Sequence, residues 1–287
     1  MDGRDGEVGT GALRVAAPLL ALTVAVVLAA SGCAAAEEVS PGRVTATFLA
    51  NEGFLIGDST RSVIVDGFVT EAYSKYGAVD ASTWERMLAR EAPFENVVLA
   101  LVSHVHRDHF QRKAAMAFLL AHPETTLVSS PNVRLALESE PGFETVAGRV
   151  RSLEPGWGET LSFETDGVRV EFLHLPHGGR PWSEIHNFGH VISIGGKSIL
   201  HIGDAQQDPE PYEAAGLGQR VFDIALIPYW MYASSEGTAL RQSHLRGRSE
   251  IAAHIPPRER ERVAEGIGGR FPAVQVPARA LQTFGVP

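Results

Sequence analysis

The sequence predicts an α/β fold in which two β-sheets pack together and helices cover them. Three observations support this prediction. Runs of β-branched and apolar residues occur in both halves of the chain, helical patterns lie between them, and no linker separates the halves. With 287 residues and 44% hydrophobic side chains, the chain has enough apolar material for one core. We expect a single domain over residues 43–287.

The first half begins with three short strand-like runs that predict an antiparallel meander, at 44–49, 53–58 and 61–67. A helix is expected over 82–92, with Ser82 as a candidate N-cap. The apolar run 97–102 is typical of a buried strand. After it we expect a helix, a strand and a short helix, at 111–122, 125–130 and 132–139.

The second half repeats this pattern. Strand-like runs occupy 167–175, 189–196, 198–204 and 222–230. We expect a helix within 237–245, then a last strand over 250–257 and a closing helix over 258–267.

The N-terminus differs in composition from the rest. Arg14 precedes an uncharged apolar run, Val15–Ala30, which is shorter than the ~20 residues of a spanning helix and has the length of a signal-peptide core. The run ends in Ser-Gly-Cys33, which resembles a bacterial lipoprotein box. We therefore expect a lipoprotein signal over 1–33 and a tether over 34–42. An uncleaved anchor or an ordinary secretory signal are the alternatives.

This interpretation places the protein outside the cytoplasm, attached to the bacterial cell envelope membrane by a lipid on Cys33. Cys33 is the only cysteine, so we expect neither an intramolecular disulfide nor a thiolate ligand. The formal net charge is −9 and no cluster of Lys and Arg occurs, which argues against a nucleic-acid partner. The expected partner of the folded domain is a small-molecule substrate.

The densest group of chemically active residues follows the 97–102 strand, in the segment "SHVHRDHF". His104 and His106 are two residues apart, so in an extended segment their side chains leave on the same side. Asp108 and His109 follow where the chain must turn. Imidazole and carboxylate groups in such a loop suit zinc or a similar metal. One metal could take the first pair and a second metal the other pair.

Further ligand candidates stand at the ends of other apolar strands. His177, Asp204 and His254 each follow such a run. A single residue of this kind is more often a turn or cap residue. Together with the 104–109 cluster, the three predict a metal site at one edge of the stacked sheets.

The motif His104-x-His106-x-Asp108-His109 resembles the HxHxDH signature of the metallo-β-lactamase superfamily, and its lactonase-like and phosphodiesterase-like branch most of all. The resemblance covers about residues 43–256. It implies the four-layer αββα sandwich of that superfamily, with two divalent metal ions at one edge. Zinc is the expected metal, with manganese and iron as alternatives. The resemblance implies His104, His106 and His177 as ligands of one metal, Asp108, His109 and His254 as ligands of the other, and Asp204 as a bridge.

The sequence offers two candidates for the third histidine of the first metal. His177 fits best because Gly178-Gly179 follows it, and His186 is the alternative. We expect His174 to point inside a strand or to support the site, and His190 to take an aromatic position at the start of the next strand. His201 is expected to be structural. His122 and His244 are interpreted as surface residues.

The expected activity is that of a binuclear metal-dependent hydrolase. A metal-bridging hydroxide would cleave an ester, lactone or phosphodiester bond, with Asp108 as ligand and catalytic group. Tyr229, Trp230, Tyr232 and Trp182 are the candidate walls of the substrate pocket. The alternatives are a mononuclear iron enzyme resembling persulfide dioxygenases, a β-lactamase, and a non-enzymatic envelope binding protein.

Overall fold

A computed structural model describes residues 43–178 and 185–287, which lie within a unit formed by residues 39–287. Within these residues the strands form two sheets. The first has the order β13-β1-β2-β3-β4-β5-β6 and the second the order β12-β11-β10-β9-β8-β7. Cys33, Trp182 and the proposed signal and tether lie outside the described residues.

The first sheet contains the N-terminal half of the unit and one strand from its C-terminus. Strands β1 to β3 and β13 are antiparallel neighbours, whereas β3 to β6 run parallel. Its strands are β1 (Thr45–Ala50), β2 (Gly53–Gly57), β3 (Ser62–Val65), β4 (Val97–Leu101), β5 (Thr126–Ser129), β6 (Val150–Ser152) and β13 (Thr283–Gly285).

The second sheet is built in the same style. Strands β7 to β10 are antiparallel neighbours, and β10, β11 and β12 run parallel. Its strands are β7 (Thr160–Thr165), β8 (Val168–His174), β9 (Phe188–Ile194), β10 (Lys197–His201), β11 (Phe222–Pro228) and β12 (Gly247–Ala253).

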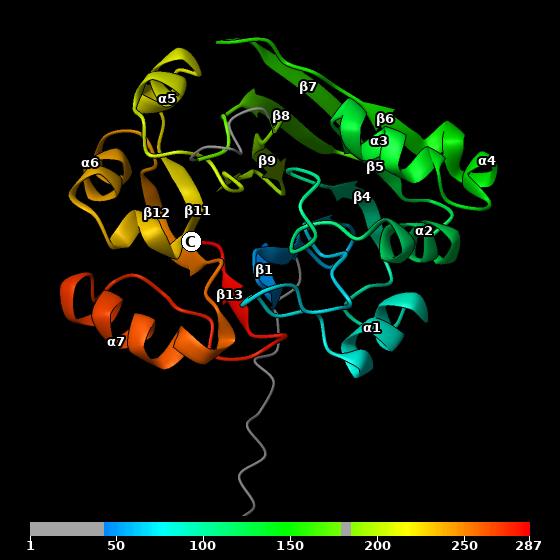
Figure 1. The fold of residues 1–287 in the computed structure, drawn as a ribbon, viewed down its shortest axis with the longest axis horizontal. Coiled ribbons are helices and arrows are strands. Elements are labelled where there is room, and N and C mark those ends of the chain that lie inside the picture. The colour runs from blue at the N-terminus through cyan, green and yellow to red at the C-terminus, as the bar shows by residue number, and fades with distance from the viewer. Residues whose placement is uncertain (1–42, 179–184) are drawn as a thin grey trace, which may run out of the picture. The chain divides into compact units, whose positions relative to one another are not determined.

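Helices cover the outer face of each sheet (Figure 1). The first sheet is covered by α1 (Ala81–Leu88), α2 (Arg112–Ala121), α3 (Pro131–Glu138) and α4 (Phe143–Val146). The second is covered by α5 (Glu210–Ala214), α6 (Ser235–Ser243) and α7 (Arg260–Arg270). Short 3₁₀ turns complete the chain at η1 (Ala147–Arg149), η3 (Leu217–Gln219), η4 (Tyr229–Tyr232) and η5 (Pro257–Glu259).

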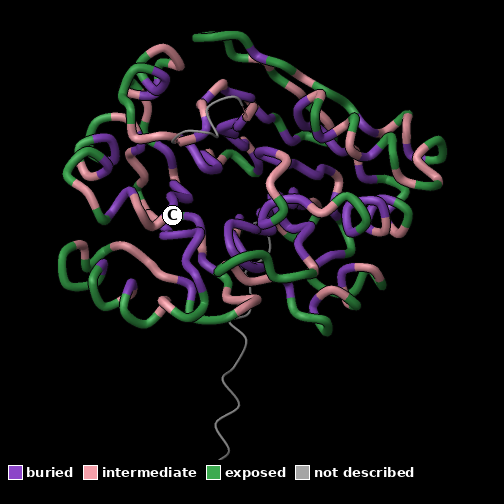
Figure 2. The backbone as a smooth tube through the Cα atoms, in the orientation of Figure 1, coloured by how far each residue is buried: buried purple, intermediate pink, exposed green. Residues whose placement is uncertain are grey.

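Three clusters of buried apolar residues join the two sheets and the two sets of helices. The central one joins the two sheets and includes Phe54, Leu99 and Phe172. One outer cluster joins the first sheet to its helices and includes Phe118, and the other joins the second sheet to its helices and includes Tyr212. Figure 2 shows the buried backbone concentrated along the strands and the exposed backbone on the helices and loops. The αββα sandwich predicted from the sequence is therefore present.

Several local predictions were wrong. Asp80, not Ser82, caps α1: its Oδ1 accepts a hydrogen bond from the Thr83 amide at 2.9 Å, because Asp80 has the extended backbone that an N-cap needs. The strand at 247–253 is not the last one, because β13 follows α7 and pairs with β1. Strands β6 and β7 were not predicted.

His122 is also not a surface residue. It is 2% exposed, and its ring stacks on Phe118 and bonds to the Met87 carbonyl oxygen at 2.7 Å. In residues 43–178 and 185–287, no helix combines the length and the apolar character that crossing a membrane would take.

Candidate metal centre

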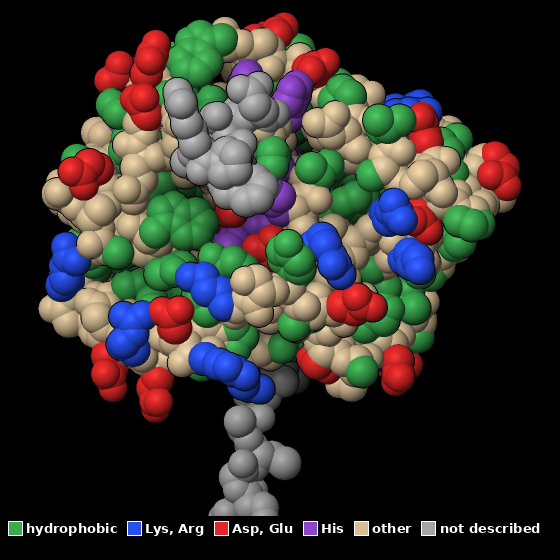
Figure 3. Space-filling model, viewed as in Figure 1, with side chains coloured by type: hydrophobic (Ala, Val, Ile, Leu, Met, Phe, Trp, Pro, Cys, Tyr) green, Lys and Arg blue, Asp and Glu red, His purple; other side chains and the backbone are tan. Residues whose placement is uncertain are grey.

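The predicted ligands from the first half lie in the loop after β4. This loop folds back on itself, since the amides of His109 and Phe110 both donate to the His106 carbonyl oxygen at 3.0 and 2.8 Å. The turn brings the four side chains to one edge of the sandwich, where His104, Asp108 and His109 are buried and His106 is half-buried. Figure 3 shows histidine and acidic side chains together in a hollow of the surface.

The second sheet brings its three predicted ligands to the same edge. His177 follows β8, Asp204 follows β10 and His254 directly follows β12. Two backbone hydrogen bonds of 3.0 Å join the loops of His177 and Asp204, from Gly178 to the Asp204 carbonyl and from Gln206 to the Pro176 carbonyl. The seven residues predicted as ligands therefore meet in one place.

The donor atoms form two groups that share one carboxylate. In the first group, donor atoms of His104, His106, His177 and Asp204 all lie within 4.8 Å of one another. Nε2 of His104 is 3.0 Å from Nδ1 of His106, and Nε2 of His177 is 3.4 Å from Oδ2 of Asp204. We refer to this group as the three-histidine position.

The second group lies around His109 and His254, whose Nε2 atoms are 2.8 Å apart. The other carboxylate oxygen of Asp204, Oδ1, is 3.2 Å from each of them. Asp108 Oδ2 is 3.4 Å from His254 Nε2. We refer to this group as the His109/His254 position. Asp204 thus turns one oxygen to each position, as a bridging ligand would.

Neighbouring polar residues hold the loop after β4. The Asp66 carboxylate bonds to Nδ1 of His109 at 2.8 Å and accepts from the amide of Ser103 at 2.7 Å. The Ser103 hydroxyl lies 2.9 Å from Nδ1 of His104. On the other side, the side-chain amide of Asn51 donates to the Asp108 carbonyl oxygen at 2.9 Å. Such contacts fix the orientation of ligand side chains.

Three residues of this edge have a left-handed backbone, which residues other than glycine seldom adopt. They are Asn51, Asp66 and His254, with φ of 49°, 47° and 58°. Strained backbone of this kind concentrates at functional sites. Each of these residues stands immediately after a strand of the site edge.

Burial and charge shift the pKa values in the centre in opposite directions. Burial lowers the pKa of His104 well below the usual histidine value. Burial alone would also lower the pKa of His109, but the Asp204 and Asp66 carboxylates raise it well above that value. Likewise, burial alone would raise the pKa of Asp204, yet His254 and His109 hold it well below its usual range. Without a metal, His104 is therefore neutral and Asp204 ionised, whereas His109 holds a proton that a bound metal ion would displace.

The donor set fits divalent metal ions. Five histidines and two aspartates supply nitrogen and oxygen ligands. Two buried atoms that face the positions, His177 Nε2 and Asp204 Oδ1, lack a hydrogen-bond partner within the described residues. Unpartnered buried polar atoms cost free energy unless something binds them. A metal ion at each position would compensate that cost.

The remaining histidines belong to neither of the two ligand groups. His186, the alternative third ligand, is partly exposed and pairs with Glu154 at 3.3 Å instead. His174 lies at the end of β8, with its ring stacked 6.3 Å from that of His186. His190 and His201 are buried in the second sheet, on adjacent strands. The structure therefore groups His177, and not His186, with the other predicted ligands.

The structure places the predicted aromatic pocket residues differently from one another. The Trp230 ring lies 5.0 Å from that of His254, and Tyr229 packs against Trp230 at 5.7 Å. Tyr232 does not line the site: it is 2% exposed, because it packs in the core between the second sheet and its helices, and its hydroxyl bonds to Glu250 at 3.3 Å. Tyr76 was missed, although its ring is 4.2 Å from His254. Its "YSKY" segment shows no pattern that would have identified it.

Two buried acids of the site were also missed as participants, Glu52 and Asp66. Asp66 ends an apolar strand, the same signal that identified Asp204, so the sequence did carry a hint. Glu52 stands in the Asn-Glu-Gly turn between β1 and β2, and a turn is where an exposed acid is ordinarily expected.

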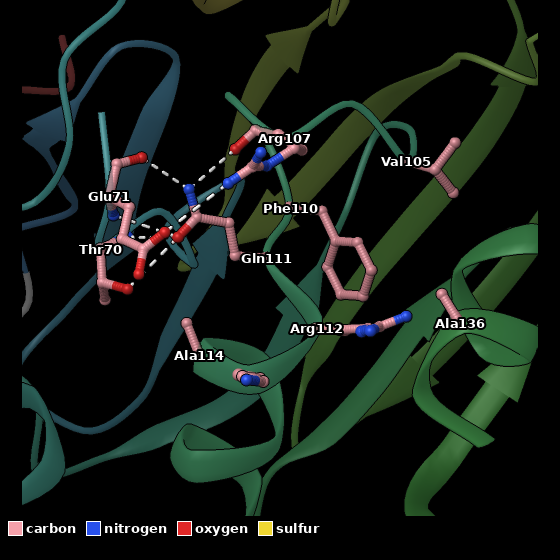
Figure 4. A pocket seen from close by; sticks show the side chains of 10 residues that line it. Thr70, Glu71, Val105, Arg107, Phe110, Gln111, Arg112, Ala114 and Ala136 are labelled. Atoms are coloured by element: carbon pink, nitrogen blue, oxygen red, sulfur yellow. Dashed lines mark hydrogen bonds and ion pairs between the residues drawn. The ribbon is translucent and has the colours of Figure 1, made fainter. Parts of the chain in front are cut away.

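A separate groove of about 480 Å³ lies beside the metal-binding loop (Figure 4). Phe110 and Val105 contribute apolar surface to it, and Gln111 fixes its wall by accepting from the amides of Thr70 and Glu71, both at 3.1 Å. None of the seven predicted ligands is among its lining residues.

Comparison with known proteins agrees with this geometry. A family model described as a β-lactamase superfamily domain matches residues 76–271, more than half of the chain. The chain therefore belongs to the β-lactamase superfamily, with the metallo-β-lactamase fold. Among curated proteins, none matches this chain.

Solved structures show the same fold at low sequence identity. The chain resembles an isothiocyanate hydrolase from Delia radicum gut bacteria with 13% identity and a TM-score of 0.59, over 84% of this chain and 99% of that one. It resembles a possible metal-dependent hydrolase from Veillonella parvula with 14% identity and a TM-score of 0.58, over the same shares. A metallo hydrolase from the archaeon Ignicoccus hospitalis has 16% identity and a TM-score of 0.54, over 84% and 98%.

Proposed function

We propose that this protein is a binuclear metal-dependent hydrolase that cleaves an ester, lactone or phosphodiester bond of a small molecule. The observation that carries the proposal is the convergence of seven ligand-type side chains in two groups that share Asp204. The shared carboxylate favours two metals over one, and thus a hydrolase over a mononuclear iron enzyme.

His104, His106 and His177 would hold one metal ion, Asp108, His109 and His254 the other, and Asp204 would bridge them. When bound, two divalent ions activate a water molecule and polarise the bond that it attacks. Zinc suits the three-histidine position, since imidazole is a common zinc ligand.

The residues of this chain would orient the reaction. Asp108 is 6% exposed, with one carboxylate oxygen toward His254, so it can act both as a ligand and as a group that orients the attacking water. Trp230 and Tyr76, beside His254, would exclude solvent and bind an apolar part of the substrate. Lys75 lies 3.2 Å from the Tyr229 hydroxyl, which would put a positive charge near an anionic or polarised substrate group.

We further propose that Cys33 carries a lipid and anchors the domain to the bacterial envelope, outside the cytoplasm. The apolar run before Cys33 and its Ser-Gly-Cys ending support this proposal. Growth of the bacterium with a radiolabelled fatty acid would test it. Label is expected on the full chain and not on Cys33→Ser.

The hydrolase proposal is tested by metal content and activity of residues 34–287. About two metal ions per chain are expected, falling to one in His177→Ala and unchanged in His186→Ala, because only His177 contacts the other ligands. The metal-loaded enzyme is then screened on lactones, phosphodiesters, β-lactams and isothiocyanates. One iron per chain with oxygen uptake would favour the dioxygenase-like alternative, and absence of metal would favour a binding protein.

A further inference from the structure

Glu52, in the turn between β1 and β2, is a carboxylate of the centre that the seven predicted ligands do not include. It is 0% exposed, and neither carboxylate oxygen has a hydrogen-bond partner within the described residues. One of its oxygens lies within 4.8 Å of donor atoms of His109, Asp204 and His254. The nearest basic atom to this carboxylate is Nδ1 of His109, 3.7 Å from Oε2, and that nitrogen already bonds to Asp66. Burying a carboxylate without a hydrogen bond is costly, so this placement suits a bound cation.

The turn that carries Glu52 is held from both sides. The Glu52 carbonyl oxygen accepts from Nε2 of His201 at 3.1 Å. The preceding Asn51 accepts from the His254 amide and donates to the Asp108 carbonyl oxygen, both at 2.9 Å. These bonds tie the turn to both ligand-bearing segments of the His109/His254 position. The turn is therefore held in place, and the fully buried carboxylate lies among the donor atoms of this position.

The two metal positions also differ in their donors. The three-histidine position has three imidazoles and one oxygen of Asp204. With Glu52 included, the His109/His254 position has two imidazoles and up to three carboxylates, from Glu52, Asp108 and Asp204. Zinc is commonly bound by imidazole and thiolate, whereas carboxylate-rich sites suit manganese, and two histidines with carboxylate suit iron(II).

We propose that Glu52 is an additional ligand of the metal at the His109/His254 position, and that it shifts the preference of this position from zinc toward manganese or iron. This inference rests on the two-metal site proposed above. It predicts a mixed-metal centre, with zinc at the three-histidine position.

The test uses Glu52→Gln, which keeps the shape of the side chain but removes its charge. Glu71→Gln is the control, because Glu71 is an exposed glutamate in the loop after β3 that pairs with Arg107 and is not among the donor groups of either metal position. Metal-free residues 34–287 are dialysed against equimolar Zn²⁺ and Mn²⁺, and both metals are counted by mass spectrometry. Titration with Mn²⁺ of protein already holding one zinc gives the affinity of the second position.

Wild-type protein and Glu71→Gln are expected to bind two metals and to hold the same share of manganese in the second position. In Glu52→Gln, the Mn²⁺ affinity of that position should fall at least about tenfold and its Zn²⁺ affinity less, so the manganese share should fall. The zinc at the three-histidine position is expected to remain, which shows that the variant is folded. Glu52→Asp, which keeps the charge, should lie between the two.

An unchanged manganese-to-zinc ratio and affinity in Glu52→Gln would overturn this inference and leave the hydrolase proposal intact. Absence of metal from the wild-type protein would overturn both. Because the readouts are metal content and affinity, they do not depend on finding the substrate.

Discussion

The two sheets contribute to the centre in different ways. Ligands of the first sheet stand in one short loop, and neighbouring residues hold them: Asp66 bonds to His109 and Ser103 to His104. The three candidate ligands of the second sheet follow three different strands, β8, β10 and β12. Two of their atoms, His177 Nε2 and Asp204 Oδ1, lack a hydrogen-bond partner within the described residues. We therefore expect the side chains of the second half to depend more on bound metal than those of the first half.

The substitution with the largest expected effect is Asp204→Asn. Asp204 turns an oxygen to each position, so the substitution affects both metals at once. We expect bound metal to fall below one ion per chain and activity to fall more than about 100-fold, since even residues that only support metal ligands are worth 10–100-fold. Metal analysis and kinetics on the best substrate measure this. Asp208→Asn, an exposed aspartate of the same loop, is the control and should behave as wild type.

Removal of metal should affect the second sheet more than the first. At metal concentrations about 1,000 times the dissociation constant, binding contributes about 4 kcal/mol to the free energy of unfolding. For a domain of this size, chelation should then lower the Tm by roughly 8–16 °C. Hydrogen exchange should rise around His177, Asp204 and His254, and rise less around 103–109. Equal protection loss in both regions would contradict the comparison.

Asp66→Asn tests the support within the first sheet. Because Asp66 contacts His109 but none of the ligands of the three-histidine position at hydrogen-bond distance, the metal at the His109/His254 position should bind about 10–100-fold more weakly. The relative affinity of this position for zinc and manganese should stay as in wild type. This result would distinguish Asp66, a residue that supports a ligand, from Glu52, a proposed ligand. Titration with the second metal measures this affinity. Weaker binding at both positions would contradict the prediction that Asp66 supports only His109.

His190 provides a contrast to the candidate ligands, because it is a buried histidine of the second sheet that belongs to neither metal position. Both ring nitrogens lack a hydrogen-bond partner within the described chain, and burial lowers its pKa to about 3. An unfolded histidine titrates near 6.5, so the unfolded state binds more protons between these values. Stability conferred by neutral His190 is therefore complete above about pH 6.5 and lost as the pH falls toward 3.

His190→Leu should remove this acid sensitivity and raise stability by about 1–3 kcal/mol near pH 5, as measured by urea unfolding across pH. His122→Leu is the contrasting variant. His122 is equally buried but bonds to the Met87 carbonyl, so its loss should destabilise by about 1–3 kcal/mol. If His190→Leu destabilised the protein at every pH, the ring would have a partner that we have not identified.

The sequence by itself predicted the fold class, which is confirmed, and the candidate ligands of the first sheet. Apolar residues at every second position, or at helical spacing, are local signals of strands and helices. They predicted the αββα layers because each strand or helix must bury the apolar face that these residues form. The 104–109 segment could be interpreted in the same way, because its four ligand-type residues are neighbours in sequence. The three strand-end residues of the second sheet needed the superfamily resemblance as well.

Only the tertiary structure decided which other residues share the site. Glu52 looked like a turn residue and Tyr76 had no pattern, yet the β1–β2 turn and the 73–76 segment pack against His254. Tyr232 belonged by sequence to the same aromatic run as Trp230, but the η4 turn directs one into the core and the other toward the centre. Contacts between distant segments depend on how strand ends and turns come together, and no local pattern encodes that.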